Sequence, residues 1–240
     1  MEQVFLSNIE LYYFPNFDES NNLIYFDGEE LYHAVKVMRN KNGDILYVTN
    51  GKGLIAETEI IETSNIKAVL RISKVYKYIN PYPNITFYIP NLKNSDRLEF
   101  ALEKCIELGI TNLIIYNSDR AIGKGIKIDR LNKIAISAMK QSLHSYLPNI
   151  SFNNSLINTK FITELIILDQ ESNTNFVNFF GKIDKNDKYT LLIGPEGGFS
   201  DRELLILNKG TKLNLAPNRL RSETACITCA SLLNFAIKVQ

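Results

Sequence analysis

The feature that most constrains the fold is the regular alternation of strand-like and helix-like segments after residue 84. We expect strands over residues 85–90, 111–116, 164–169, 189–194 and 212–216, with helices over 95–108, 129–144 and 222–239. Several of these strands are apolar throughout, which is typical of strands that are buried on both faces. The pattern therefore predicts an α/β fold, in which helices cover both sides of a parallel sheet.

The first seventy or so residues follow a different pattern, rich in strands and with one helix over residues 28–39. The apolar positions of that helix, at spacings of three and four residues, predict a buried face. These positions are Leu31, Ala34, Val35 and Met38. Two strands, 44–49 and 54–60, flank an Asn50-Gly51 turn and predict a hairpin. With a further strand over 66–75, the pattern is typical of a small, mostly antiparallel barrel. The proline-bearing segment 76–84 is the expected linker, and we assign domains to residues 1–74 and 75–240.

The charge of the chain is unevenly distributed. The net charge is +1, from 27 basic and 26 acidic residues. Residues 1–35 contain seven acids and no Lys or Arg, so the rest of the chain has a net charge of +8. A basic remainder is compatible with an RNA partner. The N-terminus has no pattern of a signal peptide, and the apolar runs are too short to span a bilayer. We therefore expect a cytoplasmic protein without a membrane segment.

The sharpest local motif is the run from Leu191 to Ser200, in which a buried strand leads into Gly194-Pro195-Glu196-Gly197-Gly198 and then into a helix. Ser200 and Glu203 have the spacing of a capping box. In an α/β sheet such a junction lies at the carboxyl edge of the strands, where ligands bind. Glycines there let the backbone approach a ligand closely. The alternative is a tight turn that needs glycines for its geometry alone.

A second junction precedes the last helix. Arg219 and Arg221 come just before Ser222 and Glu223, which open the helix. A helix N-terminus favours anions, so two cations there suggest an anionic partner, although a solvated loop is the alternative. Cys226 and the cysteine three residues later have no second pair and no nearby His. We interpret them as core residues on one helix face and expect no metal site.

Together these residues resemble a known family. Two C-terminal runs carry this resemblance: Ile193–Ser200 with Glu203, and Leu220-Arg221-Ser222-Glu223-Thr224-Ala225. They are similar to the paired C-terminal motifs of the 16S ribosomal RNA uridine N3-methyltransferases (ribosomal RNA small subunit methyltransferase E), which are of the SPOUT class. Upstream segments of the chain resemble the same family. They are His33 with Val37-Met38-Arg39, Lys104 with Glu107-Leu108-Gly109, Ser118-Asp119-Arg120, and Gln141-Ser142 with Leu147-Pro148.

The resemblance implies an N-terminal PUA-like barrel that binds RNA and a C-terminal SPOUT domain with a trefoil knot. It implies S-adenosylmethionine as the cofactor, a homodimer, and methylation of N3 of a uridine in 16S ribosomal RNA of the small subunit. The cofactor residues that it implies are Leu168, Ile193, Gly194, Pro195, Glu196, Gly197, Gly198, Leu215, Ala216, Pro217, Leu220, Arg221 and Thr224. We expect RNA to be bound by His33, Arg39, Lys93, Arg97, Lys104, Arg120, Lys124 and Gln141.

The chemistry assigns catalytic roles to three residues. Methyl transfer from a sulfonium requires positioning above all. Arg221 would stabilise the anion that forms when uridine N3 loses its proton. Glu196 or Glu223 would take that proton or orient Arg221, and the sequence leaves both possibilities open. Two alternatives also stay open: a SPOUT enzyme that acts on another RNA, such as tRNA or a ribose 2′-oxygen, and a non-catalytic RNA-binding protein of the same fold.

Overall fold

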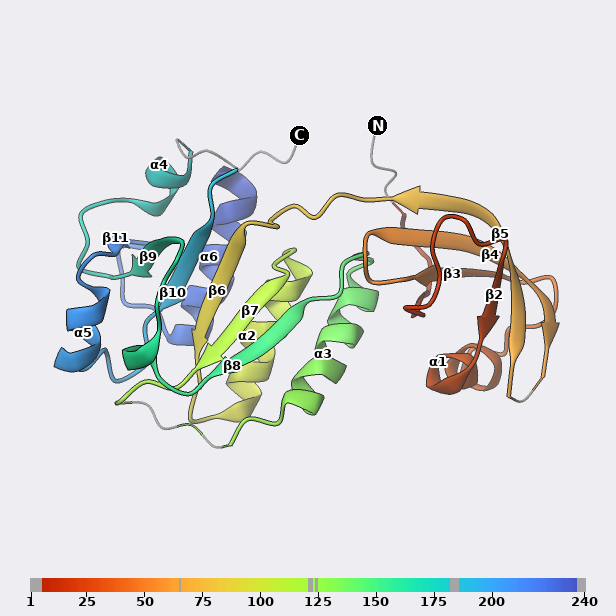
Figure 1. Ribbon diagram of the computed structural model, residues 1–240, viewed down its shortest axis with the longest axis horizontal. Coiled ribbons are helices and arrows are strands. Elements are labelled where there is room, and N and C mark those ends of the chain that lie inside the picture. The colour runs from red at the N-terminus through yellow and green to blue at the C-terminus, as the bar shows by residue number, and fades with distance from the viewer. Residues whose placement is uncertain (1–5, 65, 121–122, 124, 182–185, 237–240) are drawn as a thin grey trace. The chain divides into compact units, whose positions relative to one another are not determined.

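The computed structural model describes residues 6–64, 66–120, 123, 125–181 and 186–236 (Figure 1). The chain divides into two compact units. The first runs to Asn80 and also includes Ile136–Leu147, while the second consists of Pro81–Ala135 and the chain from Pro148 onward. Each unit contains one sheet. The assignment of domains to residues 1–74 and 75–240 stays a prediction.

The first unit is built on a five-stranded sheet. Its elements are β1 (Leu11–Tyr13), β2 (Leu23–Phe26), α1 (Gly28–Tyr32), the π-helix η1 (His33–Val37), β3 (Ile45–Thr49), β4 (Leu54–Thr63) and β5 (Ala68–Lys77). The strands lie in the order β1-β3-β4-β5-β2, and only β1 and β3 run parallel. The predicted hairpin is present as β3 and β4. Among the described residues, β1 and β2 form the edges of this mostly antiparallel sheet, with no recorded pair that closes it into a barrel.

The turn of this hairpin follows from its sequence. The Asn50 side-chain oxygen accepts hydrogen bonds from the backbone N–H groups of Lys52 (2.8 Å) and Leu54 (3.2 Å). Gly51 and Gly53 both have positive φ, at 70° and 100°, which glycine adopts without strain. Local side-chain bonds and glycines thus set the register of the two strands.

The buried face predicted for the helix over 28–39 is only partly correct. Leu31 and Ala34 are buried and Val35 is half-buried, but Met38 is 47% exposed. The helix changes at His33 from α to π geometry, whose wider turn alters the spacing of its side chains. Met38 therefore leaves the buried face that a regular α-helix would give it.

The second unit is a three-layer arrangement around a six-stranded sheet. Its elements are β6 (Ile85–Pro90), α2 (Ser95–Glu107), β7 (Asn112–Tyr116), the start of α3 (Ile128–Gln141), β8 (Asn149–Asn153), the 3-10 helix η2 (Leu156–Asn158), β9 (Glu164–Leu168), α4 (Phe176–Phe180), β10 (Tyr189–Ile193), α5 (Asp201–Leu207), β11 (Thr211–Leu213) and α6 (Ser222–Ala236). The strand order is β11-β9-β10-β6-β7-β8, and every neighbouring pair is parallel. The predicted parallel sheet is confirmed.

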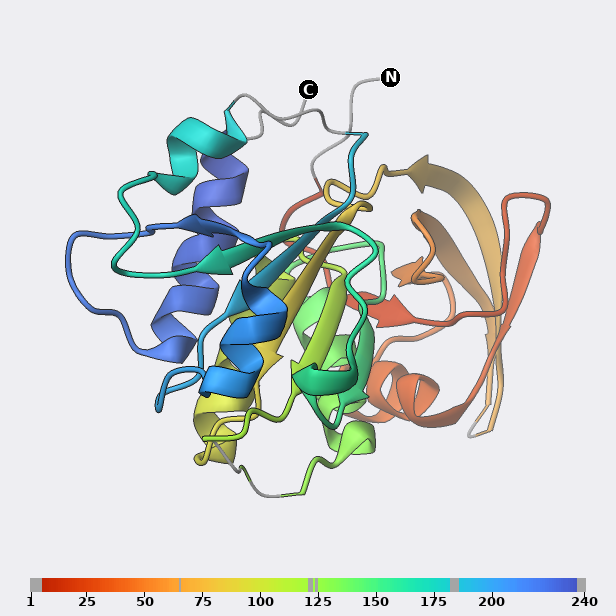
Figure 2. The same ribbon diagram turned by 60° about the vertical axis from the view of Figure 1, so that its left-hand side comes forward.

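Helices cover both faces of this sheet. Figure 2 shows α5 in front of the sheet and α2 and α6 behind it. On the α5 side, Tyr88, Tyr116, Ile167, Leu192 and Leu207 belong to one buried cluster. The other face receives the buried apolar sides of α2 and α6, which contact each other. The strands of this sheet are thus buried from two directions, which explains their apolar sequences.

The topology places three loops together. Since the strands are parallel, the loops that follow β9, β10 and β11 all leave the sheet at its carboxyl edge. The strand β10 lies between β9 and β6, so the loop after β10 also lies next to the chain that connects β6 with α2. This edge carries the candidate site.

Candidate functional site

A cavity of about 880 Å³ lies at the carboxyl edge of the second sheet. It is lined by the loops after β9, β10 and β11, by part of α5, and by Arg97 of α2. All the predicted cofactor residues line it except Gly197, Pro217 and Thr224. Further lining residues that are not among the predicted cofactor residues include Asp169, Phe199, Leu207, Lys212 and Asn214, of which Phe199 belongs to the predicted motif 191–200.

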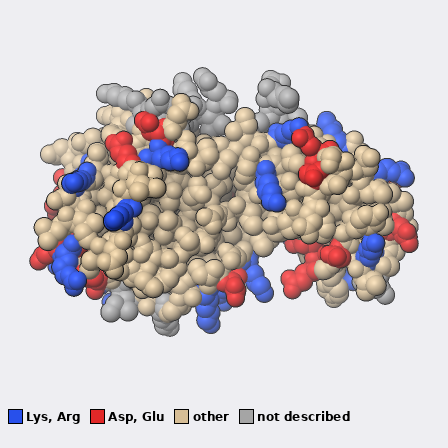
Figure 3. Space-filling model, viewed as in Figure 1, with Lys and Arg blue, Asp and Glu red and all other residues tan. Residues whose placement is uncertain are grey.

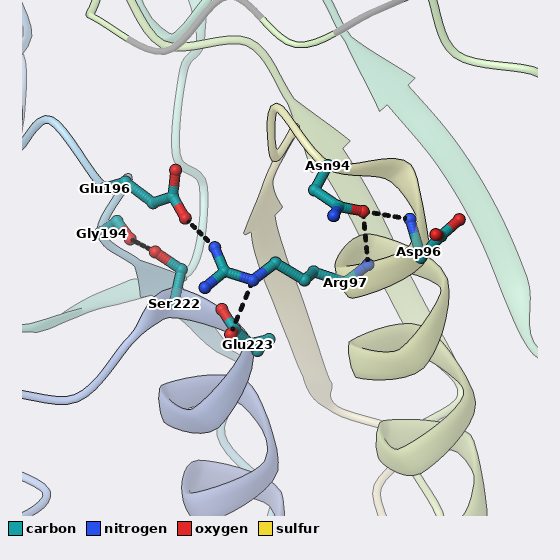
Figure 4. A network of polar contacts seen from close by, with 7 residues as sticks. All are labelled: Asn94, Asp96, Arg97, Gly194, Glu196, Ser222 and Glu223. Atoms are coloured by element: carbon teal, nitrogen blue, oxygen red, sulfur yellow. Dashed lines mark hydrogen bonds and ion pairs between the residues drawn. The ribbon is translucent and has the colours of Figure 1, made fainter.

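The loop of residues 194–198, called the glycine loop below, is held at its start by two hydrogen bonds. The hydroxyl of Tyr116, at the end of β7, donates to the carbonyl oxygen of Ile193 at 2.6 Å. Tyr116 is fully buried, and this burial raises its pKa well above 10, so the hydroxyl stays a donor. The hydroxyl of Ser222 donates to the carbonyl oxygen of Gly194 at 2.9 Å (Figure 4). The start of the glycine loop is therefore tied to both β7 and α6.

The helix after the glycine loop begins with the predicted capping box. The Ser200 hydroxyl accepts from the Glu203 N–H at 3.2 Å, and the Ser200 N–H donates to the Glu203 carboxylate at 2.8 Å. Glu203 is 1% exposed and also accepts from the Ser118 hydroxyl at 3.2 Å and the Asp119 N–H at 3.0 Å. This one carboxylate therefore fixes the chain after β7 against the start of α5.

The basic loop after β7 reaches the glycine loop. A Cβ built at Gly197 would lie 3.1 Å from the Arg120 carbonyl oxygen and 3.2 Å from the Arg120 Cβ, so the two backbones approach closely. Arg120 is exposed, with Asp201 3.9 Å from its guanidinium. Lys124, which belongs to the same loop, lies outside the described residues.

Two acidic residues of the site meet a single arginine (Figure 4). Arg97 Nη1 lies 2.5 Å from Glu196 Oε1, and Arg97 Nε lies 3.2 Å from Glu223 Oε1. The sequence predicts that Glu196 or Glu223 accepts a proton or orients Arg221, and that Arg97 binds RNA. The structure instead brings both carboxylates to Arg97.

Two further arginines, Arg219 and Arg221, lie at the cavity. Arg219 and Arg221 both line the cavity and are exposed, and no ion pair of either is recorded among the described residues. Two further lining residues pair with each other: Lys212 Nζ lies 2.9 Å from Asp169 Oδ2. Burial opposes ionisation of Asp169, but the Glu171 N–H and Lys212 together lower its pKa. The cavity is thus lined by one acid–base pair, Asp169 with Lys212, and by two arginines that have no ion pair within the described part of the chain.

The remaining residues predicted to bind RNA belong to both units: His33, Arg39 and Gln141 to the first, and Lys93 and Lys104 to the second. Lys93 and Gln141 are exposed, and Arg39 is exposed with a φ of 61°. Lys104 is held by Glu103 and Glu107, whose hydrogen bonds raise its pKa. His33 is half-buried, with its ring 6.0 Å from that of Tyr12.

On the face shown in Figure 3, Lys and Arg side chains alternate with acidic ones, and no continuous basic patch appears in its described part. The role of these residues in RNA binding stays a prediction.

Cys226 and Cys229 are buried in the core, as the sequence predicts. Cys105, Cys226 and Cys229 are all free and buried in the second unit. A hydrogen bond with the neighbouring Cys105, together with burial, raises the pKa of Cys226, which makes it an inert thiol. Within the described ranges, no group of His, Cys, Asp and Glu side chains has the arrangement of a metal site. A separate finding concerns membranes: none of the described helices is long and apolar enough to cross one.

Comparison with known proteins defines the class to which this fold and site belong. Residues 80–234 match the RNA methyltransferase domain, and residues 26–73 match the RNA methyltransferase PUA domain. The chain thus has the domain organisation of an RNA methyltransferase, with a PUA domain in its N-terminal part.

Individual relatives narrow the family further. The chain is 26% identical over 225 residues to the ribosomal RNA small subunit methyltransferase E of Bacillus subtilis, with 87% of this chain and 88% of that protein covered. It is 30% identical over 165 residues to the protein of the same name from Aquifex aeolicus, with 64% of this chain and 69% of that protein covered. The chain belongs to the ribosomal RNA small subunit methyltransferase E family.

A solved structure extends the likeness to the whole chain. A protein of Legionella pneumophila assigned as a methyltransferase, in complex with the bound cofactor SAM, superimposes with a TM-score of 0.80 at 25% identity. The match covers 96% of this chain and 98% of that one.

Proposed function

We propose that the chain is an S-adenosylmethionine-dependent methyltransferase that acts on N3 of a uridine in 16S ribosomal RNA of the small subunit. The observation that carries this proposal is the cavity at the carboxyl edge of the sheet, which is lined by both loops that the sequence resemblance assigns to the cofactor, around 191–198 and 213–225. The names of the relatives and the cofactor bound to the Legionella protein support it.

The residues around the cavity fit this cofactor. Its volume of about 880 Å³ is within the range of small-molecule sites. Apolar side chains such as Leu168, Ile193 and Leu215 suit a flat heterocycle, while exposed backbone groups suit its polar edge and a methionine moiety. At Gly198 a Cβ would meet nothing within 4 Å, so the backbone there is open to a ligand.

The chemistry needs a methyl donor and an anionic nitrogen. When bound, the cofactor supplies a methyl group on a sulfonium, and the electrons of the broken C–S bond return to sulfur. The N3–H proton of uridine must leave so that its electron pair can form the new N–C bond. Arg221, which lines the cavity and has no recorded partner among the described residues, would stabilise the imide anion.

The acceptor of that proton is the carboxylate of Glu196 in this proposal. Glu196 lines the cavity, whereas Glu223 is buried and is absent from the described lining. The ion pair with Arg97 fixes the Glu196 carboxylate at the cavity wall, where a base must lie to reach a bound substrate.

The proposal also includes the properties that the sequence resemblance implies for the whole protein. These are a trefoil knot formed by the loops around 191–198 and 213–225, a homodimer, and a place in the cytoplasm with the small ribosomal subunit as partner. The PUA domain would contribute to RNA binding.

Calorimetric titration with S-adenosylmethionine tests the cofactor. We expect binding to the wild-type chain and weaker binding to Gly194→Val, because Gly194 lines the cavity with only Phe199 and the Leu168 carbonyl within 4 Å of a Cβ there. Gly125→Val is the matched control, since Gly125 is an exposed-loop glycine outside the described cavity lining. No binding to the wild-type chain would refute the proposal.

A further inference from the structure

Arg97 connects three segments that are far apart in the sequence. It belongs to the first turn of α2, whereas Glu196 belongs to the glycine loop and Glu223 to the first turn of α6 (Figure 4). Its Nη1 and Nε atoms are used for different carboxylates, as the planar fork of a guanidinium allows. A single side chain thus connects two of the segments that build the cavity.

The backbone of Arg97 is itself fixed. The Asn94 side chain caps α2 and accepts from the N–H groups of Asp96 at 2.8 Å and of Arg97 at 3.3 Å. Leu98, the next residue, is buried in the core. The guanidinium therefore extends from a rigid point towards the more exposed glycine loop.

Glu196 and Glu223 need the positive charge of Arg97 to offset their own negative charges. Two carboxylates share one guanidinium, and the side chain of Glu223 is only 11% exposed. Its second oxygen, Oε2, is buried without a hydrogen-bond partner. An uncompensated buried carboxylate is costly. Removing Arg97 would leave Glu223 buried without its ion-pair partner and release Glu196.

We propose that Arg97 is a positioning residue, which holds the glycine loop and the start of α6 in the shape that binds the cofactor. This proposal rests on the proposed function for the identity of the cofactor. It differs from the expectation that Arg97 binds RNA, because two carboxylates already neutralise the guanidinium.

The first test measures the loop without any ligand. Hydrogen–deuterium exchange of peptides covering residues 194–200 and 222–226 should be faster in Arg97→Ala than in the wild type. Arg130→Ala is the matched control: Arg130 also pairs through two nitrogens, with Glu99 at 2.5 and 2.8 Å, but is not in the described cavity lining. It should leave the exchange of these peptides unchanged. Unchanged exchange in Arg97→Ala would overturn the proposal, whether or not the chain binds S-adenosylmethionine.

The second test separates positioning from RNA contact. For Arg97→Ala we expect an affinity for S-adenosylmethionine lower by about tenfold or more, the size of one lost charge-assisted hydrogen bond. The KM for the cofactor should rise, while the KM for RNA and the salt dependence of RNA binding stay as in the wild type. An unchanged cofactor affinity, with a salt slope reduced by about one unit, would make Arg97 a phosphate contact and overturn the proposal.

The variant Arg97→Lys tests whether a folding defect causes the loss of cofactor affinity in Arg97→Ala. It keeps the positive charge but offers a point charge in place of a fork. We expect wild-type thermal unfolding and a cofactor affinity between those of the wild type and Arg97→Ala. If Arg97→Lys bound the cofactor no better than Arg97→Ala while it was fully folded, the charge would not position the loop and the proposal would be wrong. If the wild type itself failed to bind the cofactor, the proposed function would fail, and the exchange experiment alone would decide the role of Arg97.

Discussion

The hydroxyl of Ser222 donates a 2.9 Å hydrogen bond to the carbonyl oxygen of Gly194 and so joins the start of α6 to the glycine loop. Ser222 is 6% exposed, so water cannot easily replace this bond. We expect Ser222→Ala to lower the free energy of unfolding by about 1 kcal/mol, the usual contribution of a buried hydrogen bond. Urea unfolding measures this change. Ser231→Ala, an exposed serine of the same helix, should leave stability almost unchanged, and an equal loss in both variants would contradict the assignment.

Substitution of Glu203 should lower the free energy of unfolding more than Ser222→Ala does. Its buried carboxylate accepts hydrogen bonds from Ser118, Asp119 and the Ser200 N–H. In Glu203→Gln, one oxygen becomes an NH₂ group that faces donors, so we expect a loss of about 2–3 kcal/mol of unfolding free energy. Asp201→Asn is the control on the same turn, because Asp201 is almost fully exposed. A loss below 1 kcal/mol would show that this network does not fix the loop after β7.

The stability of the second unit should fall at alkaline pH through Tyr82. Its hydroxyl donates to the Asn234 side chain at 2.7 Å, and burial raises its pKa from 10.0 to about 12. Below pH 10 the phenol is protonated in both the folded and the unfolded state, so its contribution is complete. Between pH 10 and 12 the unfolded chain loses this proton first, so the free energy of unfolding falls by up to about 1.4 kcal/mol per pH unit.

The variant Tyr82→Phe tests this pH dependence. It should reduce the slope of unfolding free energy against pH between pH 10 and 12. The control is Tyr32→Phe, at an exposed tyrosine, which should leave this slope unchanged. A slope that is the same in Tyr82→Phe and the wild type would show that Tyr82 does not hold its proton more tightly in the folded state.

Arg221 should matter far more for turnover than for cofactor binding, although it is among the predicted cofactor residues and lines the cavity. Arg221→Ala should keep the affinity for S-adenosylmethionine within about threefold and lose methylation by about 100-fold or more, as expected when one group that stabilises developing charge is removed. Arg202→Ala, an exposed arginine outside the described cavity lining, is the control. Wild-type turnover in Arg221→Ala would remove this residue from the mechanism.

The sequence predicts the parts of the site that are local in the chain. The strand, glycine loop and capped helix over 189–207 are present as expected, because a buried strand, glycines and a capping box each act within a few residues. The place of Arg97 could not be predicted in this way. It reaches Glu196 because β10 is inserted between β6 and β9, and strand order depends on the whole sheet.

Three other features lack a local signal. The strand β8 reads Asn-Ile-Ser-Phe-Asn and the helix α4 has only five residues, so neither shows a clear period. The π-helix at His33–Val37 exposes Met38, although the sequence spacing suits a regular α-helix.

We propose above that this chain transfers a methyl group to N3 of a uridine in 16S ribosomal RNA. The most direct measurement is mass spectrometry of nucleosides after incubation with S-adenosylmethionine and 30S subunits whose 16S RNA carries no N3-methyluridine. We expect N3-methyluridine to appear with the wild-type chain and to be nearly absent with Arg221→Ala. A methyl group on a ribose 2′-oxygen, or no methylated nucleoside at all, would contradict the claim.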